Sequence, residues 1–309
     1  MARGTLLFSV LGLGLLVACS STSSGTSASS PDSACQSAAE ALCAKYDQCF
    51  GTLAKALFTD NATCVARSKT SCLTDLNAPN TGATPDQLSQ CANDVKAETC
   101  DDVLSKEPDS CKDAAGTLAD GAACGKNAQC VNKFCRLAEG SKCGSCSKKA
   151  AAGGTCEASS ECEDDLVCLA GKCATPVAAG GACSDTTPCK APNRCVNKVC
   201  AKPLAVGAAC DATNGDPCDR LKGEYCSANK VCTGFVVAEA GQPCGIVNGT
   251  ATICANNGTC QTSGTSQSGT CLAAAADGAK CDDAKGPACQ IPARCVGGVC
   301  TLPDPASCK

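Results

Sequence analysis

The side chains in this chain that could do chemistry are mainly cysteines and carboxylates, because the sequence contains no histidine. Without histidine, Ser-His-Asp and Cys-His catalysis and most catalytic zinc sites are excluded. Cys143 and Cys146 have the C-x-x-C spacing of redox proteins. They lack the βαβ context of that motif, and other cysteines flank them on both sides. We therefore expect both to form structural disulfides, and we expect no enzyme activity, no cofactor and no metal site.

Two further patterns are weaker. Ser145 and Ser227 each stand three residues before a lysine, as in the S-x-x-K motif, but neither S-D-N nor K-T-G accompanies them. The acidic run 163–165 lacks the alternating oxygen ligands and the glycine of a calcium loop. We interpret the S-x-x-K matches as chance and the acidic run as solvated turn positions.

Three asparagines, Asn61, Asn248 and Asn257, match the N-glycosylation sequon. The last two are each followed by glycine, and the Asn-Gly pair is a strong turn signal. We interpret all three asparagines as turn residues.

Residues 1–18 read as an export signal, with Arg3 as its basic part and an apolar stretch too short to span a bilayer. The signal ends Leu16-Val17-Ala18-Cys19, which resembles a bacterial lipobox. The resemblance implies cleavage before Cys19, a diacylglyceryl group on its thiol and acylation of the new amine. The alternative is an ordinary secretory signal that leaves Cys19 as a plain cysteine.

Cysteine parity favours lipidation. Setting Cys19 aside leaves 34 of the 35 cysteines, an even number that can all pair. Export also supplies the oxidising surroundings in which so many cysteines persist as disulfides. Ser20 is not the Asp that signals inner-membrane retention in enteric-type lipoproteins, so sorting to the outer membrane or cell surface is expected. Residues 19–34 are then the lipidated cysteine and a flexible Ser/Thr-rich tether.

Residues 35–113 predict a small all-α domain. Ser33 and Gln36 fit a capping box at the start of a first helix, a second helix is expected over 62–73, and Thr84-Pro85 marks the start of a third. A short last helix is expected before Pro108. Eight cysteines suggest four disulfides within this domain: Cys35, Cys43, Cys49, Cys64, Cys72, Cys91, Cys100 and Cys111.

Residues 154–309 contain a recurring pattern, in which a glycine and two residues precede the first of four closely spaced cysteines. Such self-similarity indicates a tandem array of modules. The five units contain Cys156, Cys162, Cys168 and Cys173; Cys183, Cys189, Cys195 and Cys200; Cys210, Cys218, Cys226 and Cys232; Cys244, Cys254, Cys260 and Cys271; and Cys281, Cys289, Cys295 and Cys300.

A unit of about 30 residues is too small for a hydrophobic core and needs disulfides instead. In the second unit, a two-residue turn at Asn197-Lys198 would form a hairpin that pairs Cys195 with Cys200 across the strands. The same turn is expected at 170–171 and 297–298. Four cysteines allow three disulfide pairings, and the spacing does not choose among them.

A transitional unit at 114–153 has an odd number of cysteines: Cys124, Cys130, Cys135, Cys143 and Cys146. The C-terminal tail adds Cys308. If every thiol pairs, at least one disulfide must cross a boundary between units. We predict that Cys308 or one of the cysteines from 124 to 146 forms that disulfide.

The openings at Cys156, Cys183, Cys210 and Cys281, and the closing pairs at Cys168/Cys173, Cys195/Cys200 and Cys295/Cys300, resemble the Dickkopf N-terminal cysteine-rich domain as it occurs in arrays on bacterial exported proteins. The resemblance covers about half of the chain, and the longer loops between Cys244 and Cys271 depart from it. It implies an extracellular interaction module.

Without Arg3 the chain has 25 basic and 30 acidic residues, a net charge of −5. This mild acidity, without a basic cluster, argues against nucleic acid as a partner. We therefore expect a membrane-anchored, non-catalytic lipoprotein that binds a surface protein or glycan. The alternatives are a structural spacer or envelope coat component and, as a third reading, a protease inhibitor.

Overall fold

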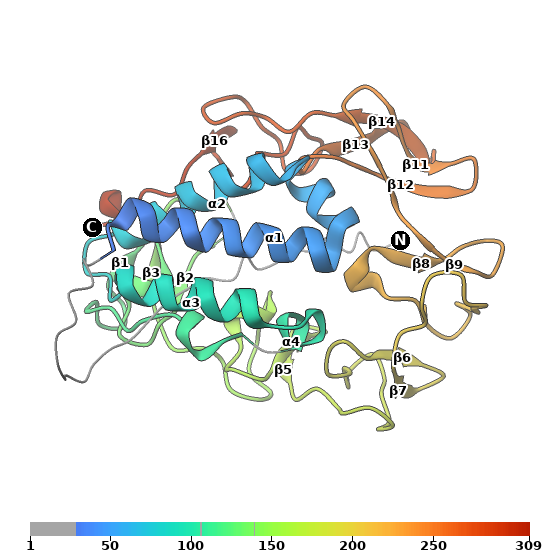
Figure 1. The fold of residues 1–309 in the computed structure, drawn as a ribbon, viewed down its shortest axis with the longest axis horizontal. Coiled ribbons are helices and arrows are strands. Elements are labelled where there is room, and N and C mark those ends of the chain that lie inside the picture. Colours follow the sequence, from blue (N-terminus) through green and yellow to red (C-terminus); the bar gives the residue numbers. More distant parts are fainter. Residues whose placement is uncertain (1–28, 106, 139) are drawn as a thin grey trace.

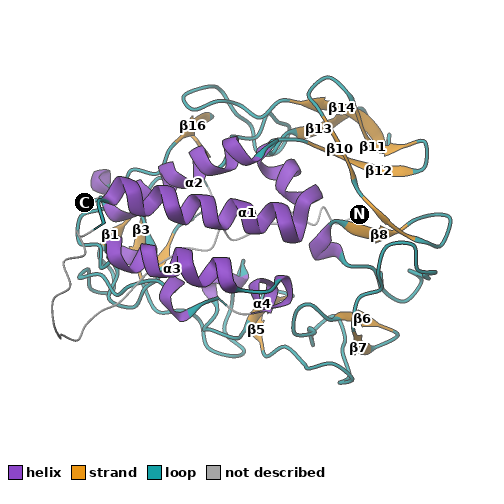
Figure 2. Ribbon diagram, viewed as in Figure 1, coloured by secondary structure: helices purple, strands orange, loops and turns teal. Residues whose placement is uncertain are grey.

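The structure, a computed structural model, describes residues 29–105, 107–138 and 140–309. Cys19, the export signal and most of the tether lie outside this part of the chain. Two parts can be distinguished in Figures 1 and 2: a bundle of helices, and a long chain of hairpins and loops that surrounds it. We call residues 31–113 the hub and residues 114–309 the belt.

The hub contains α1 (Pro31–Phe58), α2 (Asn61–Leu76), α3 (Pro85–Ala97) and α4 (Cys100–Ser105). α1 begins earlier than the sequence predicted. Ser30 is the N-cap, and its Oγ accepts a hydrogen bond from the backbone N–H of Ser33 at 3.2 Å. The predicted capping box at Ser33 is therefore wrong, and residues 31–34 belong to the helix rather than to the tether. Pro31 favours this start because its ring presets a helical φ in the first turn.

The hub core is made of small residues and sulfur. Ala34, Cys35, Ala38, Ala41, Leu88, Ala92 and Ala114 form one buried cluster. Such side chains bury little apolar area, so the helices depend on covalent links. Four disulfides provide them, as the eight cysteines predicted: Cys35–Cys72, Cys43–Cys64, Cys49–Cys100 and Cys91–Cys111.

The belt is built from short strands. Five small sheets contain β1 (Ala123–Cys124), β3 (Gly144–Cys146) and β2 (Cys135–Arg136); β4 (Val167–Leu169) and β5 (Lys172–Ala174); β6 (Arg194–Val196) and β7 (Val199–Ala201); β8 (Glu224–Cys226) and β9 (Cys232–Gly234); and β15 (Arg294–Val296) and β16 (Val299–Thr301). The larger sheet has the order β10-β12-β11-β14-β13, from Val236–Ala238, Thr250–Cys254, Pro243–Val247, Ser268–Leu272 and Thr259–Thr262.

The predicted hairpins are confirmed. Cys195 pairs with Cys200 and Val196 with Val199 across β6 and β7. The same register joins β4 to β5 and β15 to β16. The turn residues have positive φ, as two-residue hairpin turns of this kind require, and Asn197 and Lys198 have φ of 51° and 63°.

The disulfides of the five units follow one rule: the first cysteine pairs with the third and the second with the fourth. The bridges are Cys156–Cys168, Cys162–Cys173, Cys183–Cys195, Cys189–Cys200, Cys210–Cys226, Cys218–Cys232, Cys244–Cys260, Cys254–Cys271, Cys281–Cys295 and Cys289–Cys300. Residues 114–153 follow the same rule once Cys143 is set aside, with Cys124–Cys135 and Cys130–Cys146.

The opening glycine makes the same backbone hydrogen bond in each of these six units. Its backbone N–H donates to the carbonyl of the closing cysteine at 2.7–2.9 Å: Gly121 to Cys146, Gly153 to Cys173, Gly180 to Cys200, Gly207 to Cys232, Gly241 to Cys271 and Gly278 to Cys300. All six glycines have φ between 79° and 86°. This backbone conformation is costly for any residue with a Cβ, which explains the glycine in the sequence pattern.

Gly180→Ala is therefore expected to destabilise its unit by about 1–2 kcal/mol, the cost of a left-handed backbone for an L-residue. A Cβ at Gly180 would meet nothing within 4 Å, so the effect reports φ alone. Chemical denaturation measures it. Gly51→Ala is the matched control, because Gly51 is helical, has open space and lacks a positive φ. It should be neutral or stabilising by up to about 1 kcal/mol, and equal losses for both variants would contradict this explanation.

The belt returns to where it starts. From β1–β3 the chain passes β4–β7 and β8–β9, crosses to the sheet of β10–β14, and comes back along the hub with β15 and β16 (Figure 1). The C-terminus lies beside β1, and a disulfide between Cys143 and Cys308 joins the two ends of the belt. This is the boundary-crossing bridge that the odd cysteine count predicted.

Candidate functional site

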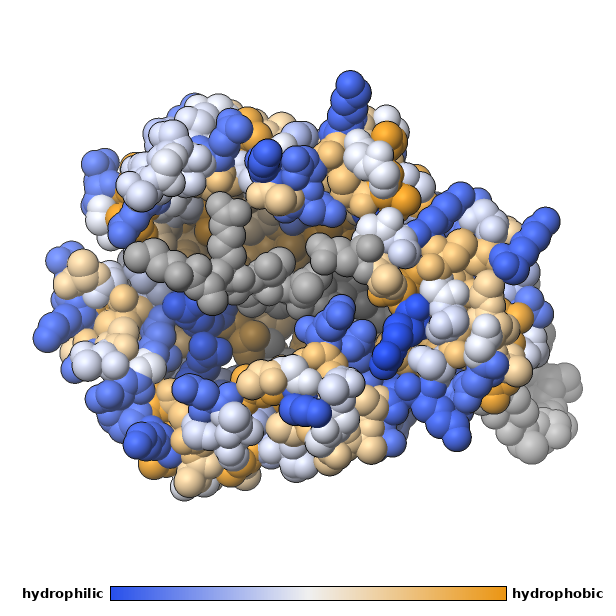
Figure 3. All heavy atoms as spheres, turned by 180° about the vertical axis from the view of Figure 1, so that it is seen from behind, coloured by the Kyte–Doolittle hydropathy of each residue, from blue (hydrophilic) through white to orange (hydrophobic). Residues whose placement is uncertain are grey.

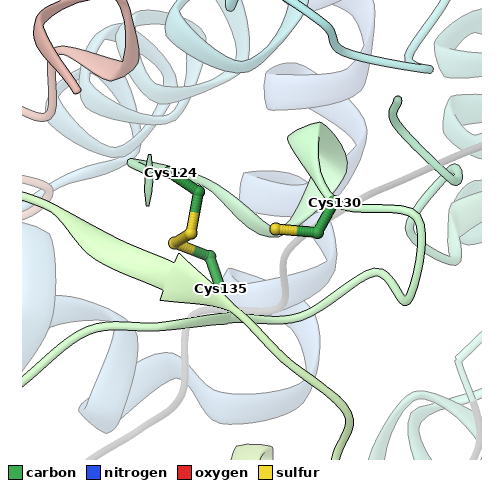
Figure 4. A group of neighbouring side chains, drawn as sticks. All are labelled: Cys124, Cys130 and Cys135. Atoms are coloured by element: carbon green, nitrogen blue, oxygen red, sulfur yellow. A yellow bond between two sulfur atoms is a disulfide. The ribbon is translucent and has the colours of Figure 1, made fainter. Parts of the chain in front are cut away.

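Clusters of cysteine sulfur are the first candidate site. Several triads, such as Cys124, Cys130 and Cys135, place their sulfurs within 4.8 Å of one another, close enough to surround a metal ion. They are not ligand sets, because Cys124 is bonded to Cys135, as Figure 4 shows. Cys130 forms a disulfide with Cys146. Metals bind the thiolate, and a disulfide has none. The seventeen disulfides use every cysteine from Cys35 to Cys308, and their role in the described chain is structural.

The C-x-x-C pair follows the same pattern. Cys143 is bonded to Cys308 and Cys146 to Cys130, so these two cysteines do not form a disulfide with each other. A redox C-x-x-C motif cycles between a dithiol and its own internal disulfide. The arrangement here fits the structural role that the sequence favoured.

The other candidate residues lie at turns or in helices. Ser227 Oγ donates to the carbonyl of Val231, and the N–H of Lys230 donates to the carbonyl of Ser227, so this S-x-x-K match forms a turn. Asp164 of the acidic run accepts from Lys149 Nζ at 2.9 Å. Asn248 and Asn257 have φ of 50° and 57° and lie in turns as predicted. Asn61 does not, because it begins α2 and its Nδ2 donates to Asp47 Oδ2.

Arg67 bonds to the belt through four hydrogen bonds. From the middle of α2 its guanidinium donates to both carboxylate oxygens of Asp277, at 2.7 and 2.8 Å, and to the carbonyls of Gln290 and Ile291. The Arg67 side chain is only 16% exposed. Its hydrogen bonds hold the pKa of Asp277 below the usual range. Planar bidentate pairs of this kind combine energy with strict geometry, so Arg67 sets where the last unit lies on the hub.

The C-terminus of α1 is closed by the belt. The backbone N–H groups of Asn256 and Asn257 donate to the carbonyls of Lys55 and Ala56 at 3.3 and 2.6 Å. The last carbonyls of a helix have no partner within it. The carbonyl of Lys55 also accepts from the cap residue Thr59, and the belt adds a donor to each of the two carbonyls. Asn257 Nδ2 also donates to the carbonyl of Cys289, which links the fourth unit to the fifth. The asparagine of a sequon is thus used inside the fold.

Residues 114–153, where the belt begins, are bonded to the hub at the opposite end of α1. Lys126 forms an ion pair with Asp75 of α2 at 2.7 Å, with both side chains at most 20% exposed. Gln129, which is 1% exposed, donates from Nε2 to the carbonyl of Pro79 and accepts from the N–H of Gly125. These buried polar groups are paired, as burial requires.

Two carboxyl groups lie where the hub meets the first belt units, and burial alters both. Desolvation, with the nearby charge of Asp113, raises the pKa of Glu107 to about 8, and Lys149 acts in the opposite direction. Desolvation raises the pKa of Asp113 to about 7, against a hydrogen bond from Asn127 Nδ2. Near neutral pH the folded protein therefore holds Glu107 mostly protonated and Asp113 about half protonated.

The sign of the resulting pH dependence follows from these raised pKa values. An acid whose folded-state pKa lies above its unfolded value stabilises the fold below the unfolded pKa and loses that contribution as pH rises through the folded one. We expect stability to fall between about pH 5 and pH 8. Urea unfolding across this range measures it, and Glu107→Gln with Asp113→Asn should flatten the slope. Asp109→Asn, at an exposed ion pair with Lys112, is the control; an unchanged slope in the double variant would contradict the assignment.

The cavities among the described residues are small or open. An apolar cavity of about 80 Å³ lies between α1, α2 and α3, with Leu42, Leu88 and Val95 in its walls. Ligand sites usually enclose about 300–1,000 Å³, so this space is a packing defect of a small-residue core. An open groove of about 420 Å³ runs between α2 and the tail at Pro303–Ala306. Neither space gathers the side chains of a catalytic set.

Comparisons with known proteins return no match: no family model, no curated protein and no solved structure is similar to this chain. Within the described part of the chain, none of the helices is both long and apolar enough to span a bilayer. Cys19, the predicted lipidation site, is outside that part. Neither Arg67 nor the pair of Glu107 and Asp113 was predicted from the sequence, because charged residues at these positions follow no recognisable spacing.

Proposed function

We propose that this protein is an exported bacterial lipoprotein, anchored through Cys19, whose tandem disulfide-bonded units bind a surface protein or glycan without catalysis. The observation that carries the proposal is the complete pairing of the cysteines from Cys35 to Cys308 into seventeen disulfides, with their ends joined in one belt. Such dense oxidation fits a protein that works outside the cytoplasm. The lipobox supplies the anchor.

A binding role is favoured over that of a spacer because of the belt's path. A spacer spans the greatest length when its units are arranged in a line. This belt instead folds back on the hub, and its ends are covalently joined. What it presents outward is a set of short loops held at both ends by disulfides. On the face seen in Figure 3, hydrophobic residues are scattered among hydrophilic ones, which suits recognition by polar loops.

The anchor is tested by the intact mass of the protein extracted from membranes, recorded with and without reduction and alkylation. The proposal predicts a chain that begins at Cys19, carries added acyl mass and has no alkylatable thiol before reduction. A chain that retains residues 1–18, or an unmodified Cys19, would overturn the anchoring.

The binding role is tested separately, with a panel of envelope glycans and surface proteins probed against the purified protein. The control is the same protein after reduction and alkylation, which keeps the composition and removes the folded units. Saturable binding that disappears on reduction is expected. Binding to no member of the panel, or binding that survives reduction, would count against a folded binding module.

A further inference from the structure

The charge of the belt is uneven. Residues 114–153 contain six basic and two acidic residues, a net charge of +4, whereas the rest of the chain after residue 19 carries 19 basic and 28 acidic residues, a net charge of −9. The overall acidity therefore hides one strongly basic unit. The sequence-based expectation that the chain has no basic cluster is therefore wrong for residues 114–153.

Three of the six basic residues are used within the fold. Lys126 pairs with Asp75, Lys149 with Asp164, and Lys142 lies 3.9 Å from Asp304. The other three, Lys133, Arg136 and Lys148, form no ion pair with any described residue. Arg136 and Lys148 are exposed and Lys133 is half-buried. We call these three residues the basic edge.

The basic edge adjoins the sheet of β1, β3 and β2, in which β2 is one of the two outer strands. Lys133 comes shortly before β2, and Lys148 shortly after β3. Arg136 belongs to β2 and pairs with Ser145 of β3. The N–H of Ser147 donates to the carbonyl of Phe134, which continues the strand pairing and brings Lys148 next to Lys133. Val131, in the turn just before Lys133, has 50% of its surface exposed. An exposed aliphatic side chain beside cations that pair with no described residue is typical of a surface that rests on lipid headgroups.

The first described residue, Ser29, lies at the same end of the molecule as the basic edge. The Ser29 N–H lies 3.4 Å from Asp86 Oδ1, and Ser89 Oγ donates to Ser29 Oγ, both in the first turns of α3. The segment just before α3 is bonded to the basic unit, since the N–H of Gly82 donates to the carbonyl of Ala128. Figure 1 shows the start of α1 at the same end as β1, β2 and β3. Ser29, the first described residue, therefore lies at the same end of the molecule as this basic unit.

We propose that the basic edge contacts the anionic lipid headgroups of the membrane in which the protein is anchored. The choice of a membrane as the partner rests on the proposed lipid anchor. The charge and the exposure of the basic edge are observed independently of that anchor. Cations near an anionic bilayer each add attraction, and such a patch commonly acts as a second signal beside a lipid chain. Asp120 accepts a hydrogen bond from Asn132, and Asp164 from Lys149. These two carboxylates weaken the field of the unit, so the contact should be short-ranged and sensitive to salt.

The test uses the chain from Ser20 onward, which holds every described residue and every disulfide but no lipid. Co-sedimentation compares vesicles of phosphatidylcholine with vesicles of phosphatidylcholine and phosphatidylglycerol in equal parts. We expect binding to the anionic vesicles alone, with release at about 1 M salt, where the Debye length is about 3 Å. Lys133→Gln with Arg136→Gln and Lys148→Gln should lower the affinity on the order of a hundredfold.

The matched control replaces three exposed lysines of other units, Lys172, Lys202 and Lys285, with glutamine. The change in net charge is the same, so it should leave most of the binding intact. Equal loss in both variants, equal binding to neutral vesicles, or tighter binding to duplex DNA than to anionic vesicles would overturn the proposal. Because no lipid is attached, failure here leaves the anchor at Cys19 untouched, and the intact mass tests that anchor by itself.

Discussion

Replacement of Cys143 and Cys308 by serine is expected to lower the free energy of unfolding by about 4 kcal/mol. This disulfide joins residues 165 apart in the chain, whereas the next longest bridge spans 51. The entropy that a cross-link removes from the unfolded chain grows with the loop it closes. The bridges inside the belt shorten the effective loop, so the figure lies below the value of about 5 kcal/mol for an open loop of that length. Guanidinium unfolding under non-reducing conditions measures the change.

Serine is suited to both positions because neither cysteine is buried, which distinguishes this bridge from the sixteen others. The matched control is Lys142→Ala with Asp304→Ala, which removes the neighbouring ion pair and keeps the bridge. An exposed pair should contribute less than about 1 kcal/mol. If the two double variants were equally stable, the disulfide would not hold the belt closed.

Arg67→Met is expected to cost about 2 kcal/mol, because it leaves a carboxylate and two carbonyls without their donor at the junction of hub and belt. The Asp277 side chain is 35% exposed, so water offsets part of the loss. Methionine keeps most of the side-chain volume, so the loss reports on hydrogen bonding and charge rather than on a cavity. A second readout is the carboxyl of Asp277. Its pKa, held low by Arg67, should return towards the ordinary aspartate value in the variant, and carbon-13 NMR can follow it.

Lys69→Met is the matched control for this prediction. Lys69 is also in α2 and pairs with Asp32 at 2.8 Å, but the Asp32 side chain is 71% exposed. Its loss should cost less than about 1 kcal/mol. A similar cost for the two variants, with an unchanged pKa of Asp277, would show that Arg67 does not hold the last unit against α2.

Local structure was largely predictable from the sequence. Cysteine spacing and a two-residue turn define each hairpin, because opposite positions in a tight turn leave few alternative registers. Thr84 and Pro85 located the start of α3 for a similar local reason. The start of α1 was misplaced because Ser30 and Ser33 are both acceptable caps, and the proline after Ser30 decides between them.

The pairing of the ends could be predicted only in part. An odd count in residues 114–153 required a bridge to another unit, but the choice of Cys143 depends on the path of about 165 residues of belt. That path is set by contacts such as those of Arg67 and Asn257, whose partners lie far away in the sequence. No periodicity signals a bond over such a distance.

The basic charge of residues 114–153 was not predicted, for a different reason. A net charge averaged over the whole chain hides a unit of opposite sign, and the six basic residues of 114–153 are spaced too widely to form a run. Folding gathers Lys133 and Lys148 through the pairing of β2 with β3. Charge summed unit by unit would have found the basic unit from the sequence.

The closed belt is tested most directly by non-reducing proteolysis of the native protein, followed by mass spectrometry of the disulfide-linked peptides. A closed belt requires a linked pair that contains Cys143 and Cys308, and units in which the first cysteine is bonded to the third and the second to the fourth. A free thiol at Cys143 or Cys308, or a bridge from Cys143 to Cys146, would contradict the closed belt.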